Sequence, residues 1–344
     1  MLKLKFAGAL FAALTALPFA SAQAQSYPEM NIRVAHFFSS AAVQSQIDAW
    51  WASEIEKRSG GKIKVKIFWA ESMGKASEIL DLVGSGAVEM GATAPGYFPS
   101  RLPLSGVTNS LPLVFKSNRQ AQLITTALAE MPDIQAEHKR NKVWPVFYHS
   151  INNFKLLCTK PIAKLDEIKG LKIRSYGEYV PKMWEKLGAV GINTMTPELY
   201  EGLERGKLDC SYFPAELSGG LKLYEVAKYE STADFGAIPT WPIYVNYDLW
   251  HKKWPAEVKA LIAQVSKEAA ARDIEMVGDA GRSALDKAVK DGGVKVVAFQ
   301  DQAELVKTAP DFMGMWVANM KKKGLGDAAE RIAAQWKKLL AETP

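Results

Sequence analysis

Two periods of apolar residues alternate along the first part of the chain, one typical of strands and one typical of helices. Residues 31–35 form a short apolar strand, and over residues 62–67 apolar side chains alternate with lysines, which predicts a half-buried strand. Between them, apolar residues recur at helical spacing over 43–55 until a Ser-Gly-Gly sequence ends the helix. A helix at 76–83 and a strand at 88–93 complete a β-α-β-α-β order, which predicts a parallel sheet.

A second set of strands and helices begins near residue 150. Thr196-Pro197 is typical of a helix start, an N-cap residue followed by proline at the first helical position. Two similar units, each with strands alternating with helices, predict an α/β protein with two lobes. The predicted elements of the second unit are strands at 155–159, 171–175 and 208–212 and helices at 178–187 and from Thr196 to Gly206.

A long helical pattern follows over residues 256–291, where no proline occurs. At a rise of roughly 1.5 Å per residue it reaches roughly 50 Å, further than one small lobe. Gly278 and Gly281 interrupt the pattern, so it is either one helix that spans both lobes with a kink near these glycines, which we favour, or two helices. A strand over 294–299 and a helical tail over 302–340 complete the chain.

The composition is that of a globular protein with room for two domains. The 344 residues are 48% apolar and 23% charged. With 43 basic and 37 acidic residues the formal net charge is +6, but the charges are interspersed and the basic and aromatic pattern of a nucleic-acid reader is missing. Nucleic acid is therefore not an expected partner.

The first 24 residues have the features of a secretory signal peptide. Lys3 and Lys5 precede an apolar run over 6–19, and small residues follow around Ala22 and Ala24. The apolar run is shorter than the roughly 20 residues that a spanning helix needs. We expect cleavage near Ala22 or Ala24 and a mature protein outside the cytoplasm.

The sequence shows no motif of a catalytic or metal-binding site. It has no Gly-x-Ser-x-Gly elbow, no phosphate-binding loop, no dinucleotide fingerprint and no His-Glu-x-x-His. The four histidines are scattered without ligand spacing, so no metal site of the protein and no other cofactor is expected, while a metal that bridges a bound ligand is left open. Export permits a disulfide between Cys158 and Cys210, but a chain of this length can build a core without one. We expect two buried thiols, with the disulfide as the alternative.

Five segments of the chain resemble, in the same order, the solute-binding proteins of tripartite ATP-independent periplasmic (TRAP) transporters, the DctP-type family. The most specific of them is residues 165–174, LDEIKGLKIR. The other four are 59–65 (SGGKIKV), 84–91 (GSGAVEMG), 109–115 (NSLPLVF) and 196–214 (TPELYEGLERGKLDCSYFP). Together they extend over nearly the whole predicted mature chain.

The resemblance implies a periplasmic receptor that is not an enzyme. Such a receptor closes on an organic acid and delivers it to the membrane permease of the transporter. The implied fold is two-lobed and periplasmic-binding-protein-like (type II), with hinge strands and a long helix across both lobes. We expect one lobe at 25–151 plus about 239–279, and the other at 152–238 plus about 280–344. The alternatives are a periplasmic enzyme acting on small organic acids and a ligand-sensing subunit of a membrane kinase; the oligomeric state is left open.

Arg174, at the end of the most specific segment, is the residue that the resemblance assigns to the ligand. In the family, the arginine of this motif pairs with the ligand carboxylate, and a planar guanidinium can hold a carboxylate with two parallel hydrogen bonds. The helix after Tyr176 and Gly177 could add backbone donors at its N-terminus. The alternative is a surface arginine at a strand end.

Phe154 and Phe213 depart from the family pattern. They stand where many members have a second arginine and an asparagine, so each replaces a carboxylate partner by an aromatic ring. One anion anchor in a more apolar pocket favours a monocarboxylate with an aromatic or aliphatic body over a dicarboxylate. The alternative is that both rings belong to the core.

The remaining candidates for ligand contacts lie mostly after the strands of the first lobe, because α/β sheets bind ligands beyond their strand ends. These candidates are His36, Phe37, Glu71, Thr93 and Tyr97, together with Asn152, which could donate a hydrogen bond, and Trp241, which could cover the ligand.

Overall fold

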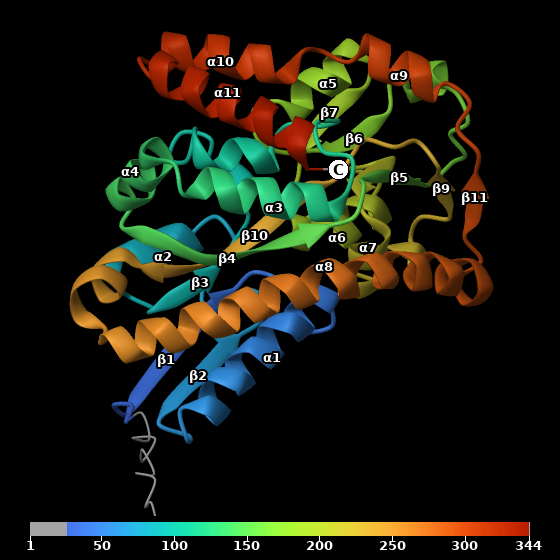
Figure 1. Ribbon diagram of the computed structural model, residues 1–344. Helices are drawn as coiled ribbons and strands as arrows, with labels where there is room; N and C mark the ends of the chain where they lie inside the picture. Colours follow the sequence, from blue (N-terminus) through green and yellow to red (C-terminus); the bar gives the residue numbers. More distant parts are fainter. Residues whose placement is uncertain (1–25, 344) are drawn as a thin grey trace, which may run out of the picture.

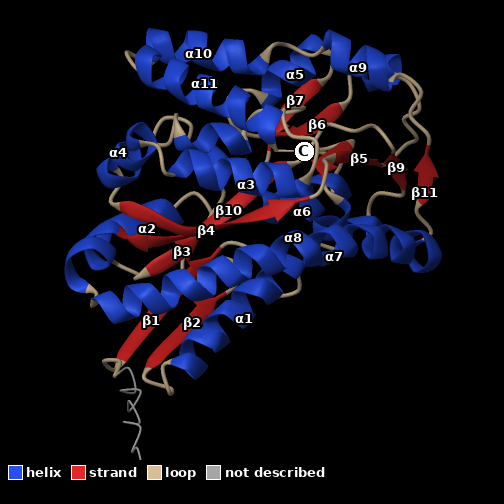
Figure 2. Cartoon of the chain, in the orientation of Figure 1, coloured by secondary structure: helices blue, strands red, loops and turns tan. Residues whose placement is uncertain are grey.

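Two sheets, each covered by helices, form two lobes of the protein in a computed structural model (Figure 1; Figure 2). The structure describes residues 26–343, so the predicted signal peptide lies outside the described residues. Across the described residues, every helix is too short or too polar to cross a membrane. The two-lobed α/β fold predicted from the sequence is confirmed.

The first sheet has the strand order β2-β1-β3-β10-β4. Its first three strands run parallel, which confirms the predicted β-α-β-α-β unit, and β10 then runs antiparallel to both β3 and β4. The lysines of β2 are exposed, whereas Ile63 is fully buried. Its elements are β1 (Met30–His36), α1 (Val43–Arg58), β2 (Ile63–Phe68), α2 (Ile79–Ser85), β3 (Met90–Ala92), η1 (Pro95–Tyr97), η2 (Ser105–Asn109), α3 (Asn118–Ala129), α4 (Pro132–Arg140), β4 (Val143–Ile151) and β10 (Ile238–Asn246).

The second sheet has the strand order β11-β9-β5-β8-β6-β7. The predicted helix from Thr196 is divided into a 3-10 turn and a short α-helix, so Thr196 is no N-cap of an α-helix. The elements of this sheet and its helices are β5 (Lys155–Cys158), η3 (Leu165–Ile168), β6 (Lys172–Ser175), α5 (Val180–Lys186), β7 (Val190–Asn193), η4 (Thr196–Glu198), α6 (Leu199–Glu204), β8 (Cys210–Phe213), α7 (Ala215–Gly220), η5 (Leu223–Glu225), β9 (Tyr229–Ser231) and β11 (Lys295–Val297).

Three segments carry the chain between the lobes. β4 leads into β5, and β10 returns beside it, with Ile238 paired to Ile151 at the crossing. After the π-helical turn η6 (Leu249–Lys253), α8 (Ala256–Gly292) runs as one unbroken helix from α1 and β4 to α7 (Figure 1). The alternative of two helices is therefore wrong. The bounds that we expect for each lobe stay a prediction.

The tail consists of three helices that contact both lobes: α9 (Gln302–Thr308), α10 (Phe312–Lys322) and α11 (Gly326–Glu342). From α10, the Trp316 indole donates to the carbonyl of Pro103 in the first lobe, and the Asn319 amide donates to the Tyr179 hydroxyl in the second. In α11, the ring of Trp336 stacks on that of Phe115. The tail therefore braces the two lobes against each other.

Cys158 and Cys210 form a disulfide, which corrects our expectation of two thiols. The two residues are direct partners in the antiparallel pairing of β5 with β8, and both are fully buried. The separation of 52 residues along the chain hid this register from the sequence analysis.

Candidate functional site

Arg174 lies in β6 with its side chain buried between the lobes and only 2% exposed. Its Nε donates to the Thr194 carbonyl at 3.2 Å and its Nη1 to the Tyr212 carbonyl at 3.1 Å. Its Nη2 donates to the Thr196 hydroxyl at 3.1 Å. A guanidinium carries five N–H groups. One N–H on Nη1 and one on Nη2 are therefore left for a ligand.

Aromatic rings enclose this guanidinium. Its central carbon lies 4.5 Å from the ring centre of Tyr176 and 5.1 Å from that of Phe213, distances at which a cation is attracted to a ring face. The ring centre of Phe154 lies 4.4 Å from that of Tyr212, and Phe154 lines the same cavity as Arg174. The two rings that replace polar residues of the family pattern therefore stand beside the arginine.

A cavity between the lobes opens onto Arg174. Arg174 is the single charged side chain among the residues that line it. Its free volume of about 20 Å³ holds about one water molecule, so a larger ligand requires the lobes or side chains to move apart. The lining residues are Phe37, Phe38, Ala94, Tyr97, Asn109, Ile151, Phe154, Arg174, Tyr176, Thr196, Phe213, Leu217, Ile238, Thr240 and Trp241.

Seven of the eleven candidate residues meet in this cavity, and four do not. The seven are Phe37, Tyr97, Phe154, Arg174, Tyr176, Phe213 and Trp241. Three candidates outside the cavity have protein partners: the Glu71 carboxylate accepts from the Ala76 N–H, the Thr93 hydroxyl donates to the Ala76 carbonyl, and Asn152 donates to Glu216 and to the Val277 carbonyl. The start of α5 does not line the cavity either.

The fourth candidate outside the cavity, His36, belongs to a buried network behind the cavity wall. The His36 Nδ1 accepts from the Phe38 N–H, so its Nε2 donates to Asp48 at 3.0 Å. The Trp241 indole donates to the same carboxylate at 3.3 Å. His149 lies between Asp48 and Asp273 and donates to both, at 2.8 and 2.6 Å.

The network carries charge in the protein interior. Burial lowers the pKa of His149, but the charges of Asp48 and Asp273 and hydrogen bonds to both outweigh burial and raise it to about 10. Burial raises the pKa of Asp48, but His149 and His36 together outweigh burial and lower it to about 2. An imidazolium between two carboxylates therefore joins α1, β4 and α8 behind the Trp241 ring.

Several cavity residues were missed by the sequence analysis, chiefly the polar residues Asn109, Thr196 and Thr240. Asn109 and Thr196 lie inside segments that resemble the family, but their pattern carries no sign of a ligand contact. Thr196 was interpreted as a helix cap because Thr-Pro is typical of one. Thr240 lies in β10 between two prolines. Because proline is atypical of a central strand, the sequence pattern does not indicate a strand there.

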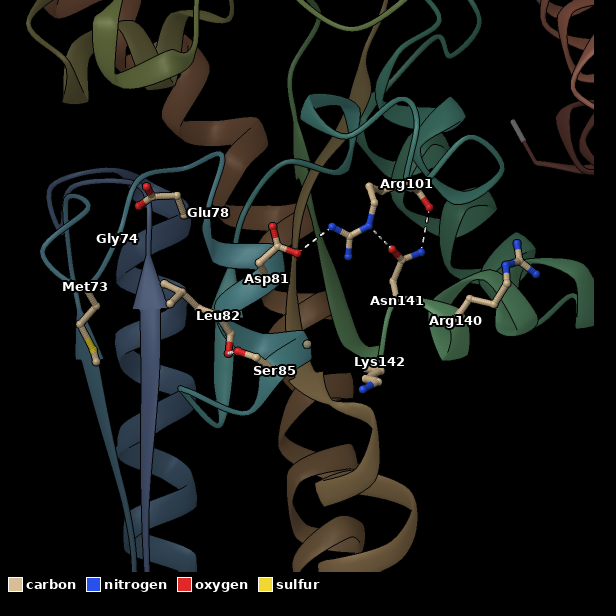
Figure 3. A pocket seen from close by; sticks show the side chains of 11 residues that line it. Met73, Gly74, Glu78, Asp81, Leu82, Ser85, Arg101, Arg140, Asn141 and Lys142 are labelled. Atoms are coloured by element: carbon tan, nitrogen blue, oxygen red, sulfur yellow. Dashed lines mark hydrogen bonds and ion pairs between the residues drawn. The ribbon is translucent and has the colours of Figure 1, made fainter.

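A larger hollow of about 720 Å³ lies on the first lobe between α2 and residues 140–142. Figure 3 shows the Arg101 guanidinium held between Asp81, at 2.6 Å, and Asn141, at 2.7 Å, while Arg140 lies apart from them. The Arg101 cation is satisfied by protein partners, whereas Arg140 and Lys142 also line the hollow, which shares no residue with the cavity between the lobes. The buried cavity, which seven of the predicted site residues line, is the better candidate for the ligand site, although it is smaller.

Two lobes joined by three crossing segments, with a single cation in the cavity between them, define a two-lobed binding protein for a small anion. Residues 34–310 match the bacterial extracellular solute-binding proteins of family 7, the DctP family. The chain therefore belongs to this family, as its motifs indicated, and is a solute-binding receptor of the TRAP type.

The chain is similar to several known proteins. A Haemophilus influenzae protein is 26% identical over 219 residues, which span 62% of this chain and 64% of that protein. The 2,3-diketo-L-gulonate-binding periplasmic protein YiaO of Escherichia coli is 24% identical over 81% of this chain and 83% of its own. A TRAP solute-binding protein of Rhodoferax ferrireducens, solved with copurified benzoate, has a TM-score of 0.79 at 20% identity and covers 91% of this chain and 98% of its own.

Proposed function

We propose that this receptor captures a monocarboxylate with an aromatic or aliphatic body and delivers it unchanged to the membrane permease of a TRAP transporter. The mature protein acts in the periplasm after removal of residues 1–24. One observation carries the choice of ligand: Arg174 has two N–H groups left over, and no other side chain that lines the cavity is charged. A guanidinium can hold one carboxylate with two N–H groups.

The rest of the cavity disfavours a second carboxylate. Phe37, Phe154, Phe213 and Trp241 present rings to the ligand, and an ion buried against them without a counter-ion loses several kcal/mol of hydration free energy. Rings and aliphatic side chains instead contribute favourable free energy through burial of an apolar ligand body. The benzoate bound by the Rhodoferax ferrireducens relative is an acid of this kind.

Binding proceeds by hinge closure in this proposal. With free volume for about one water, the cavity admits a ligand when the lobes part at the β4 and β10 crossings. The carboxylate then pairs with Arg174, and contacts from the first lobe stabilise the closed form that the permease recognises.

A thermal-shift panel of the mature protein tests the proposal. Because a ligand that binds the folded state stabilises it, aromatic and aliphatic monocarboxylates should raise the melting temperature, and C4 dicarboxylates should not. Shifts with dicarboxylates alone would contradict the single-anchor cavity, and no shift with any acid would contradict carboxylate binding. Chromatography after incubation tests the enzyme alternative, which requires that the bound acid be converted.

A further inference from the structure

We propose that Thr196 and Tyr97 form a latch, a hydrogen-bonded pair that joins the two lobes. The Thr196 hydroxyl of this pair also accepts a hydrogen bond from Arg174, and the pair supplies a third donor to the ligand carboxylate. This assignment rests on the proposed function and adds Thr196 to it as a ligand-binding residue. Tyr97 ends η1 in the first lobe, and Thr196 begins η4 in the second, 99 residues later.

Two hydrogen bonds join the pair across the cavity. The Tyr97 hydroxyl lies 2.7 Å from the Thr196 Oγ1, and it also accepts from the Thr196 backbone N–H at 3.1 Å. The Thr196 Oγ1 is at the same time the acceptor for the Arg174 Nη2. The Arg174 guanidinium, the Thr196 hydroxyl and the Tyr97 hydroxyl therefore form one chain of hydrogen bonds. In this chain, the Thr196 hydroxyl connects Arg174 of the second lobe to Tyr97 of the first.

A count of hydrogens shows what this chain leaves for a ligand. Tyr97 and Thr196 bring two hydroxyl hydrogens, and the bond between them uses one. Whichever hydroxyl donates in that bond, the hydrogen of the other has no acceptor among residues 26–343, and both residues line the cavity. It joins the two free N–H groups of Arg174, so side chains that line the cavity carry three donors without an acceptor among the described residues.

Three donors and no charged acceptor suit a carboxylate, whose two oxygens offer about four acceptor positions. The carboxylate is then held by the second lobe through Arg174 and by the latch that the first lobe completes. When the lobes part, Tyr97 leaves Thr196, and the first lobe no longer fixes the hydroxyl that bonds the carboxylate beside Arg174. The latch therefore links tight binding of the carboxylate to lobe closure.

Substitutions in the latch test this assignment by titration calorimetry and stopped-flow release. The probe is benzoate or butyrate, whichever the wild-type protein binds more tightly. Thr196→Val and Tyr97→Phe, which remove one hydroxyl each, should weaken binding about 10- to 100-fold, chiefly through faster release. Thr196→Ser should restore most of the loss, and the Tyr97→Phe/Thr196→Val double variant should lose no more than either single variant.

Tyr200→Phe is the matched control, because it removes a tyrosine hydroxyl that bonds Glu225 outside the cavity. It should bind the probe as the wild type does. Wild-type affinity in Thr196→Val, or losses that add in the double variant, would overturn the latch while leaving the receptor intact. A wild-type protein that binds no acid would instead overturn the proposed function, and the latch with it.

Discussion

At the scale of single residues, the central question is how the protein stabilises the buried cation of Arg174 before an anion binds. Arg174 is compensated by two carbonyls, one hydroxyl and the faces of two rings, and these hold the guanidinium in one orientation. Partial compensation leaves the site receptive to an anion, because a carboxylate adds a full counter-charge that dipoles do not provide. As the proposed anion anchor, Arg174 is therefore held in one orientation and has two N–H groups left for a ligand.

Replacing this anchor should remove binding and leave the fold. Arg174→Ala is expected to weaken binding of any carboxylate at least about 100-fold, because two charge-assisted hydrogen bonds disappear. Arg174→Lys should not restore binding, since an ammonium group cannot offer the planar pair of N–H donors of a guanidinium. Calorimetry measures the affinity and circular dichroism the fold. Arg331→Ala, which removes an exposed ion pair with Asp133, is the control, and equal affinity in Arg174→Ala would refute the assignment.

His149 should make stability depend on pH in the alkaline range. Its pKa rises from about 6.5 in the unfolded chain to about 10, so its contribution is fully present below about pH 6.5 and is lost as the pH rises through about 10. The free energy of unfolding of the wild type should exceed that of His149→Gln most at pH 5–6, by about 3–5 kcal/mol. Urea denaturation at pH 6 and pH 10 measures the difference, and an equal difference at both would contradict a buried imidazolium.

The residues of the site differ in how far the sequence reveals them. Arg174 lies in a segment that resembles a family whose arginine binds the ligand, so it could be predicted. His149 pairs with Asp48, 101 residues earlier, and with Asp273, 124 residues later, and no local pattern encodes such contacts. Tyr97 was predicted from its place after a strand, but its partner Thr196 was hidden by a helix-cap pattern.

At the scale of elements, α8 is attached to the crossing strand through Asn152. The Asn152 amide donates to Glu216 of α7 at 3.1 Å and to the Val277 carbonyl of α8 at 2.7 Å. Gly281 lies one turn further along α8, and a Cβ there would collide with the Asn152 amide. The glycine therefore allows the helix to approach the hinge.

The two glycines of α8 should respond in opposite ways to the same change. Gly278→Ala meets nothing within 4 Å and should stabilise the protein by up to about 1 kcal/mol through helix propensity. Gly281→Ala should destabilise it, by about 1–3 kcal/mol, because the Asn152 amide must leave its partners. Thermal denaturation compares them directly. Equal stabilisation by both would contradict the close contact at the hinge.

The spacing of apolar residues, every second residue in strands and every three to four in helices, predicted most strands and helices of the two lobes. Half-buried elements keep such a regular spacing. The crossing strands β4 and β10 were expected only as hinge strands without bounds. Both contain prolines, and β10 is buried along its whole length, so neither shows alternation. The sequence favours one helix for α8 but does not exclude two, because two glycines reduce helix propensity without removing the backbone hydrogen bonds of the helix.

At the scale of the whole molecule, the cavity, the crossing strands and the tail helices are connected to one another through both lobes. The β4 and β10 crossings join the lobes, α8 and the tail helices span both, and the cavity wall lies against the charged network on α1, β4 and α8. In the proposed function, the lobes rotate at the β4 and β10 crossings. The order of the motifs predicted this architecture, but contacts between lobes depend on the closed arrangement and appear only in three dimensions. In the proposed function, Arg174 is the single anion anchor in a cavity whose other lining residues are uncharged.

Titration calorimetry with two matched pairs of acids tests that claim most directly. Benzoate and phthalate share a ring, butyrate and succinate share a four-carbon chain, and within each pair the acids differ by one carboxylate. We predict saturable one-to-one binding of at least one monocarboxylate, and binding of its dicarboxylate partner at least about 100-fold weaker, because a second buried carboxylate finds no cation. A dicarboxylate that binds more tightly than its monocarboxylate partner would contradict the account.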